Sequence, residues 1–363
     1  MKRHSDTGTA GAGHLQLSSN LRPGASRTTT MRQRWGVILA GGDGTRLQPL
    51  TRIACGDDRP KQFCPLLGGK TLLAHTRRRL SKTLDPDRVI FALAKKHEPY
   101  YMEELESVPE FQRIVQSHNQ GNLPAILWSL MRLVSWENQA LVEIFPSDHY
   151  FANEDGFIST IERTFDFADK ERDSVILLGA EATHPETEYG WIEPEGSTAR
   201  RLSREFASVQ RFWEKPTREI ARELLTKGCL WNTFVMIGSA GAFLKMIQQT
   251  VPVLFERFEA ALLSGESESE EHSMQSIYDS LVPSDFSKQV LAQSAERLLV
   301  TSCGDVGWSD LGEPRRFIAA LTEDGRKPPR SWECLTDCLA EVTSTDSAPG
   351  HSRVRSAPMR IGC

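Results

Sequence analysis

Four short apolar runs alternate with amphipathic segments in the first half of this chain, and this alternation limits the folds it can adopt. The runs are WGVILA (35–40), RVIFALA (88–94), ALVEIF (140–145) and SVILLGA (174–180). Continuous runs of this kind are typical of strands buried on both faces, as in parallel sheets. Helical spacing marks the segments between them, which include TLLAHTRRRL (71–80), LPAILWSLMRLVSW (123–136) and EDGFISTIERTFDFAD (154–169). We therefore expect an α/β fold with right-handed crossovers.

The sequence after residue 180 has a different character. EYGWIEPEG (188–196) and SREFASVQRFWEKP (203–216) are polar, aromatic and rich in turn residues. They predict antiparallel strands and loops laid over the sheet. Helices are predicted at IARELLTKG (220–228), GAFLKMIQQT (241–250) and residues 271–282, and the acidic run ESESEE (266–271) predicts a solvated loop or a helix start.

Both ends of the chain differ from the part between them. Residues 1–33 are rich in Gly, Ser, Thr and Arg, which predicts a disordered tail or an over-long start, with translation beginning at Met31. Residues 323–363 have almost no periodicity and predict a loosely ordered tail. One domain over residues 34–322 is expected between these tails.

Composition disfavours several classes of partner. The formal net charge is −5, so no global basic field indicates nucleic acid. No apolar stretch approaches the roughly 20 residues that a membrane-spanning helix needs. The seven cysteines contain no CxxC pair, so reduced thiols are expected rather than a structural zinc site. We expect a cytoplasmic protein that binds neither nucleic acid nor a membrane.

A glycine-rich segment, LAGGDGTRLQPLT (39–51), directly follows the first predicted strand. A turn of this kind exposes backbone N–H groups, because no Cβ blocks close approach, and such groups bind phosphate oxygens well. Arg46 adds a planar donor group suited to phosphate. The segment RPKQF (59–63) supplies a second cation, Lys61, soon afterwards.

Two better-known phosphate-binding motifs do not fit. The dinucleotide fingerprint GxGxxG needs a third glycine where Leu47 stands, which disfavours a dinucleotide-dependent oxidoreductase. The segment GGKT (68–71) would be a P-loop only with glycine in place of Cys64. These two glycines instead predict a turn before the helix near Thr71.

Further motifs follow in order: FPSDH (145–149), EYGWIEP (188–194), FWEKP (212–216), LWNTFVM (230–236) and GWSDLGEP (307–314). With the glycine-rich segment and RPKQF they make seven, and in this order they resemble the signature of sugar-phosphate nucleotidyltransferases. The PKQF ending most resembles mannose-1-phosphate guanylyltransferases. The resemblance spans roughly Trp35 to Phe317.

The resemblance implies a mixed, mostly parallel α/β/α sandwich, a Rossmann-like nucleotide-diphospho-sugar transferase fold. It implies that GTP and a sugar 1-phosphate, mannose 1-phosphate in the simplest case, bind at the carboxyl ends of the strands. The sugar phosphate would attack the α-phosphate, with Mg²⁺ as cofactor, and pyrophosphate would leave. A homodimer is possible.

Four side chains are expected to carry the chemistry. Arg46 would neutralise the leaving pyrophosphate, and Lys61 the charge on the α-phosphate. Asp148 and Asp310 would hold Mg²⁺, which favours few carboxylates together with phosphates and water. Either aspartate could instead be a helix N-cap, Asp148 before EDGF and Asp310 before a helix near Glu313. The resemblance assigns nucleotide binding to Leu39, Ala40, Gly41, Gly42, Gly44, Thr45, Arg46, Lys61, Asn119, Gly121, Pro146 and Asp148.

The sugar phosphate would contact a second group of residues. Lys215 would hold its phosphate, and Glu214 and Asn232 would reach sugar hydroxyls. Gly190 would allow close approach of the sugar, and Glu193 would accept hydrogen bonds from its hydroxyls.

Several aromatic residues in these motifs have a simpler interpretation. We expect Trp191, Trp213 and Trp231 to pack in the core. A general base at His149 is not needed, because a sugar phosphate is already an anionic nucleophile.

Departures from the family pattern leave specificity open. Gln48 stands where many guanylyltransferases have tryptophan, and in NQGNLPAI (119–126) Gln120 replaces an arginine and Asn122 a threonine. A non-catalytic homologue that binds a sugar nucleotide, or the same reaction with another nucleotide or sugar phosphate, are the alternatives. Catalytic activity is favoured because the chain retains the full phosphate and metal set, namely Arg46, Lys61, Asp148, Lys215 and Asp310.

Overall fold

The computed structural model describes residues 33–196, 205–264, 268–323, 325 and 327. The tails predicted at 1–33 and 323–363 lie outside these residues, apart from a few positions at their inner ends. All four predicted apolar runs are strands: β1 (Arg34–Leu39), β2 (Val89–Ala94), β4 (Leu141–Pro146) and β6 (Val175–Glu181). Nearly every residue in them is buried, as expected for strands covered on both faces.

One mixed sheet of nine strands forms the centre of the described fold. Its other strands are β3 (Arg113–Gln116), β7 (Gly190–Pro194), β8 (Ala207–Glu214), β9 (Leu230–Ser239) and β10 (Leu298–Ser302). The strand order is β3-β2-β1-β4-β9-β6-β10-β8-β7. Among these described strands only β8 and β9 run against the others, so the expected mixed, mostly parallel sheet is confirmed.

The second half of the chain corrects one expectation. Strands β7 and β8 do not lie over the sheet but belong to it, because β7 pairs with both β8 and β9. The pairing Trp191↔Trp231 between β7 and β9 places two expected core tryptophans side by side. Both are buried and Trp213 is partly buried against the same cluster, so the expected packing role is confirmed.

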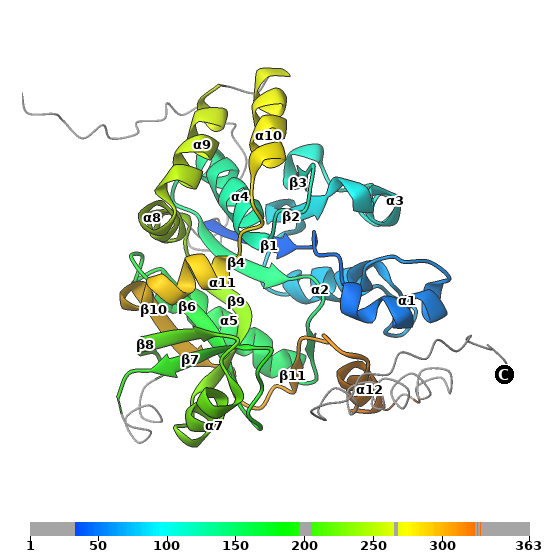
Figure 1. The fold of residues 1–363 in the computed structure, drawn as a ribbon, viewed down its shortest axis with the longest axis vertical. Coiled ribbons are helices and arrows are strands. Elements are labelled where there is room, and N and C mark those ends of the chain that lie inside the picture. Colours follow the sequence, from blue (N-terminus) through cyan, green and yellow to red (C-terminus); the bar gives the residue numbers. More distant parts are fainter. Residues whose placement is uncertain (1–32, 197–204, 265–267, 324, 326, 328–363) are drawn as a thin grey trace, which may run out of the picture.

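Helices cover the two faces of the sheet (Figure 1). On one face lie α4 (Asn122–Trp136), α8 (Ala240–Thr250), α9 (Pro252–Leu263), α10 (Glu268–Ser280) and the short α11 (Phe286–Gln289). On the other face lie α2 (Leu72–Leu80), α5 (Glu154–Ala168) and α7 (Arg218–Thr226). No helix in the described part of the chain is both long and apolar enough to cross a membrane.

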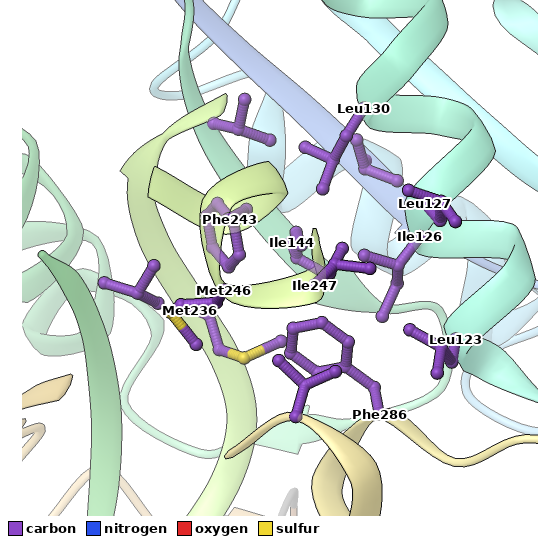
Figure 2. Close-up of a cluster of buried hydrophobic side chains, with 14 of the residues drawn as sticks. Leu123, Ile126, Leu127, Leu130, Ile144, Met236, Phe243, Met246, Ile247 and Phe286 are labelled. Atoms are coloured by element: carbon purple, nitrogen blue, oxygen red, sulfur yellow. The ribbon is translucent and has the colours of Figure 1, made fainter. Parts of the chain in front are cut away.

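Figure 2 shows the core beneath the first group of helices. Leucines and isoleucines of α4 meet Phe243, Met246 and Ile247 of α8, and Phe286 of α11 closes one side. Phe286 and Phe243 are fully buried. A complete burial of such a ring is worth about 1.5–3 kcal/mol, so α11 is firmly anchored despite its four residues.

A third, smaller cluster joins two segments that lie far apart in the sequence. It contains Leu47 and Leu50, at the start of α1 (Gln48–Cys55), together with Leu311 and Phe317. Phe317 belongs to α12 (Pro314–Glu323), which lies beside α1 in Figure 1. This packing brings the second aspartate motif, which precedes α12, against the glycine-rich segment.

The expectation of reduced thiols is wrong for one pair. Cys55, the last residue of α1, forms a disulfide with Cys64, and their Cα atoms lie 6.6 Å apart. Cys64 directly follows a single 3₁₀ turn, η3 (Lys61–Phe63). The chain folds back between α1 and η3 and so brings together two cysteines that are nine positions apart. This spacing matches no cysteine motif, so the sequence did not indicate the disulfide. Cys229 and Cys303 are buried thiols, and the three cysteines after residue 330 lie outside the described residues.

Candidate active site

A cavity of about 460 Å³ opens where β1 and β4 end. In open α/β sheets ligands bind at the carboxyl ends of the strands, so its position is the expected one. The cavity brings together many predicted site residues from distant segments. Those that line it are Leu39, Gly41, Gly42, Asn119, Gly121, Pro146, Gly190, Glu214, Asn232 and Asp310.

The glycine-rich segment is held in shape by a buried glutamine. The side-chain amide of Gln62, which is 2% exposed, donates to the carbonyl oxygens of Ala40 at 3.1 Å and Gly42 at 2.7 Å. Gly44 has φ 60°, and a Cβ there would lie 3.2 Å from the backbone nitrogen of Lys61. The KQF motif therefore folds against the glycine-rich segment and fixes its backbone. Thr45 begins a 3₁₀ turn and is exposed.

Lys61 connects the two predicted metal ligands. Its Nζ lies 3.3 Å from Oδ2 of Asp148 and donates to the carbonyl oxygens of Asp310 at 2.6 Å and Leu311 at 3.2 Å. Only 11% of the lysine side chain is exposed. The structure thus joins Lys61, Asp148 and Asp310, which are separated by up to 249 residues in the sequence, into one charged cluster.

The carboxylate of Asp310 is held by three donors. Its Oδ1 accepts from the Tyr189 hydroxyl at 3.0 Å, from Arg316 at 2.9 Å and from the backbone of Gly312 at 2.8 Å. Arg316 also pairs with Glu186 at 2.5 Å. Burial raises the pKa of the Asp310 carboxyl, but the charges of Lys61 and Arg316 outweigh it and hold that pKa at about 2. Asp310 is therefore ionised at neutral pH.

His149 lies in this cluster as a neutral side chain. Burial lowers its pKa to about 4, although Asp148 opposes the shift. Its Nδ1 accepts a hydrogen bond from Trp308 at 3.2 Å, so the basic nitrogen of the ring is already occupied. This agrees with the expectation that His149 is not a general base. The helix-cap alternative for Asp148 is wrong, because Asn153 caps α5.

Arg46 and Lys215 lie at the rim of the site and share one anion. The guanidinium of Arg46 lies 3.7 Å from Oε2 of Glu188, and Nζ of Lys215 lies 3.9 Å from the same oxygen. All three side chains are about half exposed, so these contacts are weak and screened by solvent. Two cations that the sequence assigns to different phosphates thus lie close to one another. Glu188 also lines the cavity.

Another part of the cavity, here called the acidic end, is lined by Gly190, Glu214 and Asn232. A Cβ on Gly190 would lie 2.9 Å from the Phe212 ring and 3.1 Å from Oε2 of Glu214, so any larger residue here would crowd both side chains. Burial, together with the charge of Asp285, raises the pKa of Glu214 to about 7. Asn232 is 7% exposed, and its Oδ1 accepts from the backbone of Phe234 at 3.1 Å.

Glu193 is not brought to this cavity. Its carboxylate accepts from the Trp213 indole at 3.0 Å and pairs with Lys227 at 2.8 Å, and it is absent from the lining. The side chains of successive strand residues point to opposite faces. Glu193 and Gly190 are three positions apart in β7 and so lie on different faces. The expected contact of Glu193 with sugar hydroxyls therefore has no geometric support.

Sequence reasoning missed several residues of the site. Gln62, Glu188 and Tyr189 stand inside the motifs that the sequence provides, and their polar side chains are a usable signal. Arg316 follows its motif by two residues. Asp285 and Ser287 also line the cavity, but they come from a segment with no recognised motif.

Residues 35–327 match the sequence profile of a family described as nucleotidyl transferase. The chain is 29% identical, over 76% of its length, to the alginate biosynthesis protein AlgA of Pseudomonas fluorescens. It is 26% identical, over 80% of its length, to the mannose-1-phosphate guanylyltransferase of Escherichia coli. It spans 56% and 60% of the length of these two curated relatives. A solved structure from Thermus thermophilus, described as a mannose-1-phosphate geranyltransferase, superposes with TM-score 0.68 and 26% identity, covering 80% of this chain and 79% of that one.

Proposed function

The chain belongs to the nucleotidyl transferase family, and from that premise we propose that it condenses GTP with mannose 1-phosphate or a close sugar 1-phosphate. One oxygen of the sugar phosphate attacks the α-phosphorus of the nucleotide. The bond from that phosphorus to the bridging oxygen of the β-phosphate breaks, and pyrophosphate leaves. No proton needs to be removed, because the attacking phosphate is already an anion.

The observation that carries this proposal is a cavity lined by glycine-rich backbone and carboxylates, with cations held against its lining residues. Lys61 contacts Asp310, and Arg46 and Lys215 lie beside Glu188. Transfer of this type depends on positioning and on neutralising phosphate charge rather than on covalent catalysis by the protein. Lys61 stands beside Asp148 with its ammonium group almost buried, where a positive charge acts strongly on a neighbouring α-phosphate. Arg46, at the exposed rim, suits the pyrophosphate that must depart.

We propose that Asp148 and Asp310 would hold Mg²⁺ together with the substrate phosphates. Mg²⁺ is usually held by one or two carboxylates, substrate phosphates and water, and Lys61 touches both of these residues, Asp148 at its carboxylate and Asp310 at its carbonyl oxygen. The three donors on Oδ1 of Asp310 fix the orientation of that carboxylate. Bound Mg²⁺ would neutralise the phosphates and polarise the α-phosphate.

The names of the relatives support the choice of substrates. The Escherichia coli relative is named a mannose-1-phosphate guanylyltransferase, and PKQF is retained at residues 60–63. At the acidic end, Glu214 and Asn232 line the cavity beside Gly190, which suits the hydroxyls of a sugar. The exposed ammonium of Lys215 suits the phosphate of that sugar.

Pyrophosphate release tests the proposal directly. The purified protein is given Mg²⁺ and mannose 1-phosphate with GTP, ATP, UTP, CTP or dTTP in separate reactions. Release with GTP alone is the expected result. Release with another nucleotide would keep the reaction and overturn the choice of base. Absence of release with all five, together with measurable binding of GDP-mannose, would favour the non-catalytic alternative.

A further inference from the structure

A segment just before and within α11 reaches the acidic end of the cavity. Asp285 and Ser287 of this segment line the cavity together with Glu214 and Asn232. The segment follows α10 in the sequence, and none of its residues belongs to the seven motifs of the family pattern. Its contribution to the site therefore needs a separate explanation.

The segment is pinned to the loop that precedes α4. Ser284 donates from its backbone nitrogen to the carbonyl oxygen of Gln120 at 2.9 Å, and its own carbonyl accepts from Leu123 at 3.3 Å. The backbone nitrogen of Phe286 donates to Oδ1 of Asn122 at 2.7 Å. The Phe286 ring is fully buried beside α4 and α8 (Figure 2). The positions of Asp285 and Ser287 are thus fixed from both sides.

Two carboxylates, Glu214 and Asp285, line this part of the cavity, and Ser287 lines it with them. The charge of Asp285 raises the pKa of the Glu214 carboxyl, and Ser287 acts on that pKa in the opposite direction. Oδ1 of Asp285 accepts from the backbone of Lys288 at 2.9 Å, as the N-cap of α11. The cap uses only Oδ1, and Asp285 is one of the residues that line the cavity.

The chemistry of these groups defines a class of ligand. Ionised carboxylates only accept hydrogen bonds, and a sugar ring with free hydroxyls supplies donors. A sugar that carries its own carboxylate would bring another negative charge to Asp285 and to Glu214, whose pKa of about 7 leaves it partly ionised at neutral pH. Like charges at short range in a partly buried site repel strongly.

We propose that Asp285, supported by Ser287, determines sugar specificity by selecting an uncharged hexose 1-phosphate and rejecting the corresponding sugar acid. The proposal rests on the proposed function, because it assigns the acidic end of the cavity to the sugar. It adds to that function a residue pair outside all the recognised motifs, and it names the feature of the sugar that is recognised.

The test compares Asp285→Asn with a matched control. Asparagine keeps the N-cap acceptor but replaces Oδ2 by a donor and removes the charge. Asp279→Asn changes an exposed carboxylate at the end of α10, outside the cavity. Calorimetry gives the affinities for mannose 1-phosphate and for mannuronic acid 1-phosphate, which differ only at carbon 6. Pyrophosphate release is measured in parallel with the nucleotide that the wild type prefers.

Wild-type protein should bind mannose 1-phosphate at least about tenfold more tightly than mannuronic acid 1-phosphate. Asp285→Asn should lower the affinity for mannose 1-phosphate about tenfold. The ratio of this affinity to that for mannuronic acid 1-phosphate should decrease, and the KM for the nucleotide should stay within about twofold of the wild-type value. Asp279→Asn should behave as wild type. Ser287→Ala should show a smaller shift in the same direction.

The inference would be overturned by an Asp285→Asn variant whose affinities for both sugar phosphates equal those of Asp279→Asn. It would also be overturned by an Asp285→Asn variant whose KM for the nucleotide rises as much as its sugar affinity falls, because that result would indicate a structural role. A wild type that binds neither sugar phosphate would overturn it as well. Binding and preference without pyrophosphate release would overturn the proposed function alone, because calorimetry does not depend on turnover.

Discussion

Replacing Gly121 by alanine should break the contact between the loop before α4 and the segment that carries Asp285. Gly121 has φ 88° and ψ −175°, a region that is open almost only to glycine and costs about 1–3 kcal/mol for other residues. A Cβ at this position would also lie 2.2 Å from the carbonyl oxygen of Ser284, well inside the 3.0 Å that real Cβ contacts respect. The obstacle is backbone, so no side chain can rotate away.

The expected cost follows from these two effects. Ser284 would have to move by most of an ångström, which breaks or weakens its backbone hydrogen bonds to Gln120 and Leu123. At about 1 kcal/mol each, these losses and the backbone strain add to roughly 3–5 kcal/mol. For a domain of this size, with an unfolding entropy of about 2.1 cal/mol/K per residue, the melting temperature should fall by roughly 5–8 °C. Sugar phosphate affinity should fall as well, because Asp285 shifts with Ser284.

Gly69→Ala is the control for backbone strain. Gly69 has φ 73°, and a Cβ there would meet nothing within 4 Å, so its substitution should cost only about 1–2 kcal/mol. Urea unfolding of both variants gives the difference, and calorimetry gives the sugar phosphate affinity. Equal losses of stability for the two variants, with unchanged affinity in Gly121→Ala, would refute the described contact between the two segments.

Three further predictions concern single side chains. Asp310→Asn should abolish pyrophosphate release while circular dichroism remains native; full activity at ordinary Mg²⁺ would contradict the metal assignment. Gln62→Ala removes two buried hydrogen bonds to the glycine-rich segment, so urea unfolding should show a loss of about 1–3 kcal/mol, and the KM for the nucleotide should rise more than that for the sugar phosphate. Glu214 should titrate with a pKa of about 7 by ¹³C NMR of the free protein and at lower pH in Asp285→Asn, because one raising charge is removed. Since the folded state binds this proton more tightly than the unfolded one, whose pKa is about 4.5, the Glu214 contribution to stability should decrease as the pH rises from about 4.5 to about 7.

The strands of the parallel half were predictable because burial on both faces leaves a direct mark on sequence. The runs at β1, β2, β4 and β6 contain almost no polar residue, and the structure places each within about one residue of its predicted bounds. The pairing of one strand with another leaves no such mark on the sequence. The polar, aromatic segments that form β7 and β8 predicted antiparallel strands but not the strands with which they pair, so their membership of the main sheet could not be read from the sequence.

The candidate site also has features that could be predicted from the sequence and features that could not. Lys61 and Asp148 could be predicted as site residues because the chemistry expected of them requires particular residue types, and the structure places them side by side. Contacts that fix these residues could not. The ion pair from Arg316 to Asp310 depends on how α12 packs against α1, and the place of Asp285 in the cavity depends on hydrogen bonds made by backbone atoms, which every sequence possesses.

Backbone strain gives an independent indication of where function resides. In the described part of the chain, three residues other than glycine have positive φ: Lys215 at 48°, Phe234 at 59° and Leu311 at 47°. Each such residue costs of order 1–3 kcal/mol and persists only where its surroundings enforce it. Lys215 follows Glu214, Phe234 lines the cavity, and the carbonyl of Leu311 accepts from Lys61. The strain is therefore confined to the backbone that positions the site, although these three residues come from separate motifs. A fold selected only for stability would have no reason to concentrate the strain there, whereas a binding site that must hold its side chains in fixed geometry does.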